Sequence, residues 1–325
     1  MKRKLNILIA CEESQACCRE FRKLGHNAYS CDLFKCSGII FGPDKADPHP
    51  EWHFNHDVAT VLDKTNLTLQ DGSLAVIDGD WDLMIGHPPC TFLACSGAKW
   101  LYDPNDKDKP INERKTHPRF PNRRKDQEDG AKFFMFLANA NVKRIAIENP
   151  VGIMSTRWRK PDQSVQPYMF GDPYSKNTCL WIKNLRPLHP SKPTEDHGAR
   201  IYFESGKSQP LWYSDGLTKT KSKEERQKWR SKTFPGIARA IAEQWSIQIA
   251  ADEKLLDKEE WDILGTDYLE ILDKMTGGIR YRSSEPSEEI EKRRYKITFD
   301  DDMTAQLDNR EQLLINYIKE KSKQL

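Results

Sequence analysis

Short apolar segments alternate with helix-like segments along the first 150 residues, and this alternation constrains the fold more than any other feature of the sequence. The predicted strands are residues 5–10, residues 28–31, a short strand before Asp57, a strand ending at Gly86, and residues 145–148. Residues 15–24 and 126–140 have the composition of helices. Strands that alternate with helices pair in parallel, because the helix makes the crossover. The sequence therefore predicts an α/β fold with a doubly wound, mostly parallel sheet.

The last third of the chain divides into two parts of opposite charge. Residues 170–183 indicate a hairpin or late strand, and residues 237–245 an amphipathic helix. Residues 1–250 contain 38 Lys and Arg against 30 Asp and Glu, whereas residues 251–325 contain 13 against 19. We therefore expect a basic domain over residues 1–250 and an acidic, mainly helical appendage over residues 251–325, whose role the sequence does not indicate.

The composition excludes several classes of protein. The sequence has no run of 18 apolar residues and no secretory signal, so a soluble, cytoplasmic protein that does not bind membranes is expected. Its eight cysteines are scattered, which favours free thiols over a disulfide framework. Cys31 and Cys36 lie near three histidines, but their spacing matches no standard zinc pattern, and no metal is expected.

Two polar clusters directly follow the fourth and fifth predicted strands. The first is Pro88-Pro89-Cys90, and the second is Glu148-Asn149-Pro150. In open α/β sheets, ligands bind at the carboxyl ends of the strands, where both clusters are expected. Cys90 alone fits a buried structural thiol, and Glu148 alone fits a surface carboxylate at a strand end. Their combination favours a site with a sulfur nucleophile and an acid.

These two clusters resemble the core motifs of DNA (cytosine-5) methyltransferases, and more narrowly a short, phage-borne branch of that family. The segments that carry the resemblance are residues 81–90, 145–150 and 181–185, and it extends over roughly residues 5–247. One departure is Pro150, where most of the family has valine. The resemblance implies a Rossmann-like fold that uses S-adenosyl-L-methionine, and cytosine in DNA as the partner.

The resemblance also implies catalytic roles. Cys90 adds to carbon 6 of cytosine, which makes carbon 5 nucleophilic, and Glu148 holds the ring nitrogen through a proton. Asn149 positions the glutamate or the neighbouring loop. Lys176 stands where the family has part of a glutamine and arginine motif, and it offers charge without the planar fork of arginine.

The expected cofactor site departs from the family pattern. The glycine-rich motif of the first loop is absent, and its residues contribute instead through backbone and polar groups. Asp32 fits the acid that binds the ribose, and Asp57 fits the acid that contacts the adenine, although each also fits a capping or turn role. The resemblance assigns the following residues to the cofactor: Ala10, Cys11, Glu12, Ser14, Asp32, Asp57, Pro88 and Gly236.

Two basic clusters are candidates for nucleic-acid contact. Residues 107–125 contain eight Lys and Arg and residues 219–232 contain seven, and both segments are predicted to be loops. Each cluster alone fits a solvated surface, but on a nucleic-acid enzyme they fit phosphate contacts. The candidate contacts are Arg123, Arg124, Lys125, Lys228 and Arg230. Residues 183–232 form a recognition insert that is short for extensive base readout.

Three functions are compatible with these features. The leading one is methyl transfer to carbon 5 of a cytosine flipped out of DNA. A related enzyme modifies a free nucleotide or RNA, or transfers another one-carbon group. A catalytically silent nucleic-acid-binding protein is a third reading, although it has no chemical need for Cys90 and Glu148. Target sequence and oligomeric state are not indicated.

Overall fold

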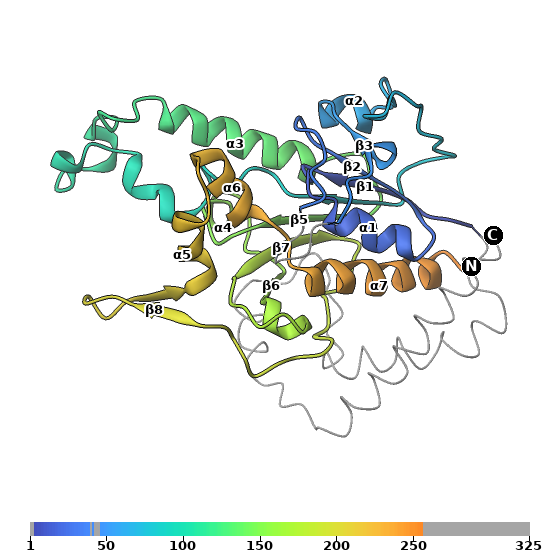
Figure 1. Cartoon of the computed structure of the whole chain (residues 1–325). Helices are drawn as coiled ribbons and strands as arrows, with labels where there is room; N and C mark the ends of the chain where they lie inside the picture. Colours follow the sequence, from blue (N-terminus) through green and yellow to red (C-terminus); the bar gives the residue numbers. More distant parts are fainter. Residues whose placement is uncertain (1–2, 40, 42–45, 256–325) are drawn as a thin grey trace.

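A seven-stranded sheet forms the centre of the molecule in the computed structural model, which describes residues 3–39, 41 and 46–255 (Figure 1). The strands are β1 (Asn6–Ala10), β2 (Asn27–Cys31), β3 (His53–Phe54), β4 (Leu83–Gly86), β5 (Ile145–Asn149), β6 (Gln163–Val165) and β7 (Thr178–Lys183). Their order in the sheet is β3-β2-β1-β4-β5-β7-β6. The first five strands are parallel, and β7 is antiparallel to both β5 and β6.

Helices cover both faces of this sheet. The helices are α1 (Ala16–Lys23), α2 (Val58–Leu62), α3 (Arg123–Ala138), α4 (Met154–Arg157), α5 (Leu211–Thr218), α6 (Lys223–Ser231) and α7 (Pro235–Asp252). Short 3-10 helices lie at Pro50–Trp52, Cys95–Trp100, Pro104–Asp106, Ile111–Glu113 and Pro167–Phe170. Helices α1 and α7 pack together on one face, and α3 lies on the other (Figure 1).

The two faces follow from the alternation of side chains along each strand. On β1, Ile7 and Ile9 are buried in the cluster that contains α1 and α7, whereas Leu8 is buried in the cluster that contains α2 and α3. On β4, Ile85 and Met84 divide in the same way. Successive side chains of a strand point to opposite faces, so strands buried on both sides must be apolar throughout. This explains the continuous apolar runs of the sequence.

The observed architecture confirms the predicted fold class, an α/β fold with a doubly wound, mostly parallel Rossmann-like sheet. The helix predicted at residues 237–245 is longer than expected, because α7 extends over Pro235–Asp252. The structure describes no residue beyond 255, so the appendage predicted over residues 251–325 lies almost entirely outside the described residues. No helix in the described part of the chain combines the length and apolar character needed to cross a bilayer.

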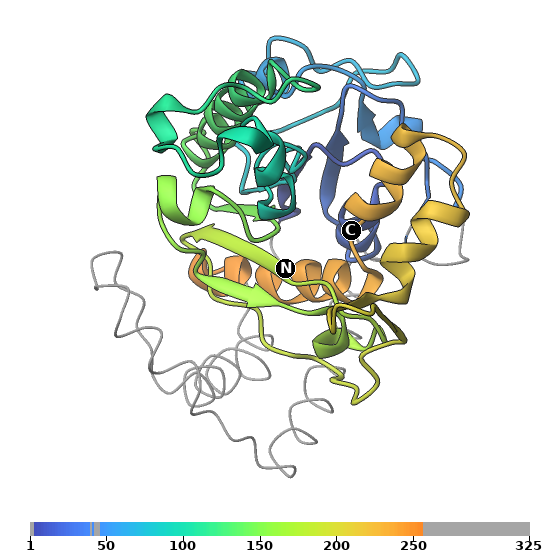
Figure 2. The ribbon, with the colours of Figure 1, turned by 90° about the vertical axis from the view of Figure 1, so that its left-hand side faces the viewer.

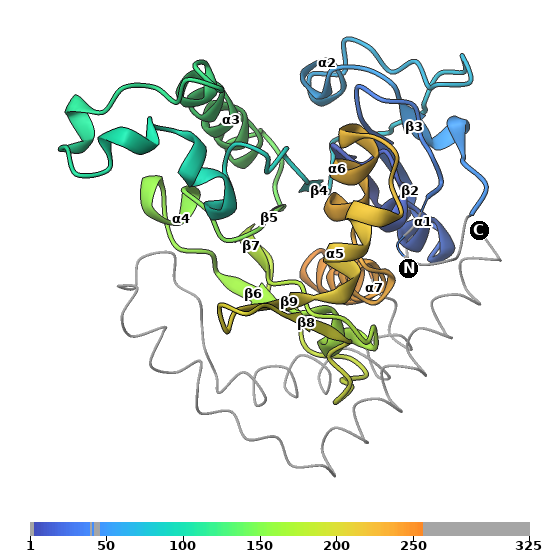
Figure 3. The ribbon, with the colours of Figure 1, turned by 60° about the vertical axis from the view of Figure 1, so that its left-hand side comes forward.

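The insert at residues 183–232 contains its own small structure. Strands β8 (Arg200–Tyr202) and β9 (Ser208–Pro210) form an antiparallel pair that leads into α5 and α6. The prediction that residues 219–232 form a loop is therefore wrong, because most of them lie in α6. Ser222 starts this helix by accepting a hydrogen bond from the Glu225 backbone N–H, a capping signal that the charge of the segment obscured. Figures 2 and 3 show α5 and α6 on one side of the molecule and the segment that leads to α3 on the other.

Candidate active site

The site lies where the strand order reverses. From β1 the chain crosses to β2, and from β4 it crosses the other way to β5, so the carboxyl ends of β1 and β4 lie side by side at a topological switch point. The backbone N–H of His87 continues the pairing beyond β4 by donating to the Ala10 carbonyl at 2.9 Å. The Pro88-Pro89-Cys90 segment therefore leaves the sheet at the edge that Ala10 and the first loop also reach.

Asn149 fixes the segment that carries Cys90. It is the last residue of β5, and its side-chain amide donates a hydrogen bond of 2.8 Å to the Pro88 carbonyl inside the protein. Proline has no N–H of its own to anchor this segment, so a bond to its carbonyl is the available restraint. Asn149 was predicted to position either Glu148 or the neighbouring loop. Its side-chain hydrogen bond is to the loop.

The residues after Cys90 are held by the first turns of α3. The Arg123 guanidinium donates to the Thr91 carbonyl at 2.9 Å, and the Gln127 amide donates to the Phe92 carbonyl at 3.0 Å. A side chain at Gly97 would collide with Arg123. Arg123 was expected to contact phosphate, but its guanidinium is engaged within the protein and restrains the loop next to Cys90.

Glu148 lies beside this segment in a nearly closed environment. Its side chain is 12% exposed, and one carboxylate oxygen lies 3.2 Å from Nδ1 of His87. Burial opposes the charge of Glu148, but Lys176 and the hydrogen bond with His87 outweigh burial, so its pKa lies below the usual value. The ionised carboxylate is the stable resting form of Glu148.

Cys90 is electrostatically coupled to these groups. Burial raises the pKa of Cys90, the charge of Glu148 raises it further, and Lys176 lowers it. The Lys176 ammonium is held by the Lys232 carbonyl at 3.0 Å, so the residue that precedes α7 positions this charge. The structure therefore brings Cys90, Glu148 and Lys176 into one electrostatic unit, although 86 residues separate the first from the last in the sequence.

Two residues of the first loop that are not glycine adopt a backbone conformation that glycine favours. Cys11 and Gln15 both have a φ of 62°, in the left-handed region that glycine favours. Such residues cost roughly 1–3 kcal/mol each and persist where their surroundings determine them. Gln15 is fully buried, and its amide exchanges hydrogen bonds with the backbone of His49 at 2.9 Å in both directions. The loop thus turns at the switch point without the glycines of the family motif.

Two polar residues of this loop serve helix α1. The Glu12 carboxylate accepts hydrogen bonds from the backbone N–H groups of Cys17 at 2.6 Å and Cys18 at 3.2 Å. The Ser14 hydroxyl accepts the Ala16 N–H at 3.5 Å. These contacts satisfy helix donors that would otherwise be unpaired. The sequence suggested cofactor contact for both side chains and did not reveal this capping.

Asp32 and Asp57 also have local contacts. Asp57 caps α2 by accepting the Ala59 N–H at 2.9 Å, which is the alternative role considered for it. Asp32 follows β2 and accepts the Phe34 N–H at 2.9 Å. Burial raises the pKa of Asp32, and the charge of Glu13 raises it further. Glu13, in the loop after β1, and Asp32, which follows β2, therefore lie close enough to interact.

Gly236 lies at the start of α7, where there is no room for a side chain. A Cβ atom would lie 2.1 Å from the Phe170 carbonyl oxygen, and the Gly236 N–H donates to Asp172 at 2.7 Å. In this structure the glycine permits close packing of α7 against the segment before β7.

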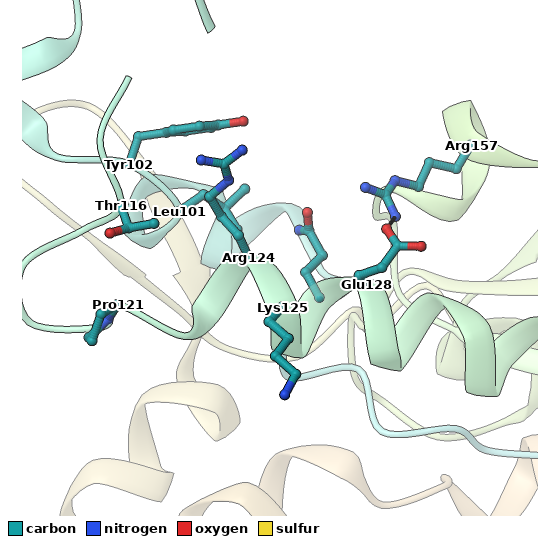
Figure 4. A pocket seen from close by; sticks show the side chains of 9 residues that line it. Leu101, Tyr102, Thr116, Pro121, Arg124, Lys125, Glu128 and Arg157 are labelled. Atoms are coloured by element: carbon teal, nitrogen blue, oxygen red, sulfur yellow. Dashed lines mark hydrogen bonds and ion pairs between the residues drawn. The ribbon is translucent and has the colours of Figure 1, made fainter. Parts of the chain in front are cut away.

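The remaining basic candidates differ in their surroundings. Arg124 and Lys125 line a cavity of about 470 Å³ together with Tyr102 and Arg157 (Figure 4). The Arg124 guanidinium lies 5.1 Å from the centre of the Tyr102 ring. On the other side, Lys228 lies 4.9 Å from the Phe34 ring and Arg230 lies 3.9 Å from the Tyr213 ring. Cations next to aromatic rings are suited to phosphates and bases.

The potential metal ligands have other partners. His53 contacts Ser30 and the Phe34 carbonyl, and His56 contacts the Thr68 carbonyl. Within the described residues, donor atoms of Glu12, Cys17 and His87 lie within 4.8 Å of one another. Both oxygens of Glu12 already accept backbone N–H groups, so we do not assign a metal site there.

Comparisons with known proteins add little to this geometry. No protein-family model matches the chain, and no curated protein matches it. One similar solved structure is an E. coli protein encoded within a prophage and described as a DNA modification methyltransferase. It is 11% identical, with a TM-score of 0.30, over 66% of this chain and 68% of that one.

The coupling of Cys90 to its neighbours predicts how its thiol titrates. Because the charge of Glu148 raises the pKa of Cys90 and Lys176 lowers it, Glu148→Gln should move the alkylation profile of Cys90 to lower pH. Lys176→Gln should move it to higher pH. The measurement is the rate of iodoacetamide modification against pH, mapped by peptide mass spectrometry with exposed Cys95 as internal reference. Identical Cys90 profiles in all three proteins would show that the groups are not coupled.

Proposed function

We propose that the protein transfers a methyl group from S-adenosyl-L-methionine to carbon 5 of cytosine in DNA, through a covalent adduct on Cys90. The observation that carries this proposal is that β4 and β5 bring the Cys90 segment, held by Asn149, to the same edge of the sheet as the buried Glu148 carboxylate, with Lys176 acting on both groups. A buried structural thiol needs neither a carboxylate nor an ammonium beside it. A thiol that adds to a pyrimidine needs both kinds of group.

The proposed reaction uses each residue in a definite step. The Cys90 thiolate forms a bond to carbon 6 while the ring nitrogen takes a proton that reaches it through the Glu148 carboxylate, so negative charge does not accumulate on the ring. Burial and the charge of Glu148 raise the pKa of Cys90, and the ammonium of Lys176 opposes them by stabilising the thiolate. Methyl transfer to carbon 5 releases S-adenosyl-L-homocysteine as a neutral thioether. Water then takes the proton from carbon 5, the sulfur–carbon bond breaks to restore the thiolate, and the ring nitrogen returns its proton through Glu148. Asn149 keeps Cys90 in place throughout by holding Pro88.

The residues at the ends of β1 and β2 fit the cofactor. One carboxylate oxygen of Glu13 is buried without a hydrogen-bond partner among the described residues, and Glu13 interacts with Asp32. Two acids at this edge suit a ligand that carries an ammonium, a sulfonium and ribose hydroxyls. S-adenosyl-L-methionine supplies an electrophilic methyl group when bound. In this proposal Asp32 accepts the ribose hydroxyls, and the bent first loop lies against the methionine part.

DNA is the proposed acceptor because of the basic side chains on both sides of the site. On one side of the site, Arg124 and Lys125 lie on α3. On the other side, Lys228 and Arg230 lie on α6. They are suited to hold the phosphates that flank a flipped cytosine, which must leave the stack to reach Cys90.

A mechanism-based trap tests the covalent step. With S-adenosyl-L-methionine, a DNA duplex containing 5-fluorocytosine should form a stable adduct on Cys90, because fluorine cannot leave carbon 5 as a proton does. Cys90→Ala should abolish both the adduct and methyl transfer at a stability cost of only about 1 kcal/mol. Cys95→Ala, which removes an exposed thiol, is the matched control and should retain both. Peptide mapping locates the adduct; methyl transfer by Cys90→Ala would falsify the mechanism.

Cofactor binding is tested at Asp32. Asp32→Asn should weaken S-adenosyl-L-methionine binding by about 10- to 100-fold, because hydrogen bonds to a charged acceptor contribute roughly 1.5–3 kcal/mol. Isothermal titration calorimetry measures the affinity. Asp71→Asn changes an exposed aspartate that stabilises a turn through Ser73 and is the matched control. Equal affinity of wild type and Asp32→Asn would remove Asp32 from the site.

DNA contact is tested at Arg124 and Lys125, leaving Arg123 intact because it holds Thr91. The double variant Arg124→Glu, Lys125→Glu should weaken binding similarly for all DNA sequences and reduce the salt slope by about one per lost phosphate contact. Lys132→Glu, further along α3, is the matched control and should leave the slope unchanged. Fluorescence anisotropy from 50 to 300 mM salt, roughly the range over which such contacts are screened, measures both quantities. A double variant with the wild-type slope would place this cluster outside the interface.

A further inference from the structure

His87 connects the candidate active site to a second buried carboxylate. It follows β4 directly, its side chain is 9% exposed, and Nδ1 lies 3.2 Å from a carboxylate oxygen of Glu148. The other ring nitrogen, Nε2, is buried and has no hydrogen-bond partner among the described residues. An imidazole with one engaged nitrogen and one unpaired nitrogen is rare in a protein interior, since unpaired buried polar groups are costly.

The side of the site formed by the first loop supplies further ionisable groups. A carboxylate oxygen of Glu12 and the sulfur of Cys17 lie within 4.8 Å of each other and of a ring nitrogen of His87. The ionisable groups around the imidazole are therefore Glu148 on β5, Glu12 in the loop after β1 and Cys17 on α1, with Lys176 acting on Glu148. Two of them are carboxylates, one on β5 and one in the loop after β1, and His87 interacts with both.

His87 lowers the pKa of both carboxylates. Burial raises the pKa of Glu12, and the interaction with His87 is the largest effect that lowers it. Burial also opposes ionisation of Glu148, but Lys176 and then His87 lower its pKa. The imidazole thus favours a negative charge on the carboxylates on either side of it.

We infer that His87 is a positioning residue shared by Glu12 and Glu148, which fixes the Glu148 carboxylate and stores the proton that Glu148 passes to the ring nitrogen of the bound base. The chemical part of this inference rests on the proposed function. When sulfur adds to carbon 6, the proton on Nδ1 of His87 passes to the ionised Glu148 carboxylate, which delivers it to the ring nitrogen of the base. When the adduct breaks down, the base returns that proton and the imidazole regains its own. No external acid is consumed.

The pairing can be measured without any enzymatic activity. Carbon-13 NMR of glutamate side-chain carboxyls reports the titration of Glu12 and Glu148, which are assigned by Glu12→Gln and Glu148→Gln. His87→Gln should move both titrations to higher pH, because both carboxylates lose the interaction that favours their charge. His49→Gln is the matched control, since His49 is half-exposed and contacts Glu51 and Trp52. An unchanged Glu148 titration in a folded His87→Gln protein would overturn the inference.

A kinetic comparison separates proton storage from simple support. His87→Asn keeps a donor near the position of Nδ1 but cannot titrate. We expect it to melt like wild type and bind S-adenosyl-L-methionine normally, yet to transfer methyl groups at least about tenfold more slowly between pH 6 and 9. Full activity with an unchanged pH profile would reduce His87 to a structural donor and overturn proton storage. If wild type transfers no methyl group, the proposed function fails, whereas the carboxyl titration still decides the pairing.

Discussion

The parallel pairing of β4 with β5 is the interaction on which the rest of the site depends. It brings two segments that are about sixty residues apart in the sequence to one edge of the sheet, with Gly86 opposite Ile147. The Asn149 side chain then bonds to the Pro88 carbonyl and fixes the segment that follows β4. Both strands are buried on their two faces. A shift in their register would therefore disrupt the packing of the core. The position of Cys90 is therefore set by the core of the protein.

The electrostatics of the site are a balance between burial and compensating charge. Burial disfavours ionisation of Cys90, Glu148 and Glu12, and each has a nearby group that acts in the opposite direction. Lys176 acts on Cys90 and Glu148, and His87 acts on Glu148 and Glu12. Such opposing effects are typical of functional sites, where the protonation state must change during a reaction. They also explain why changing one of these residues should alter the titration of its neighbours.

The departures from the family pattern have structural counterparts. Where the glycine-rich loop is missing, Cys11 and Gln15 adopt left-handed backbone, and the buried amide of Gln15 holds the turn. Where the family has arginines, Lys176 is positioned by the Lys232 carbonyl in front of α7. Within its described residues, the insert at residues 183–232 contains a two-stranded sheet and two helices, and the second of these, α6, carries the basic residues Lys228 and Arg230.

The sequence by itself determined the fold class and the two polar clusters at the switch point, because apolar runs that alternate with helices leave few ways to build a sheet. It also located the strand ends that carry Cys90 and Glu148. The contacts of individual side chains became visible in the folded protein. Arg123 restrains the loop beside Cys90, Glu12 and Asp57 cap helices, and α6 replaces a predicted loop. The role of His87 was hidden because its partner lies 61 residues away. Contacts between distant residues depend on register and packing, which local sequence patterns do not encode.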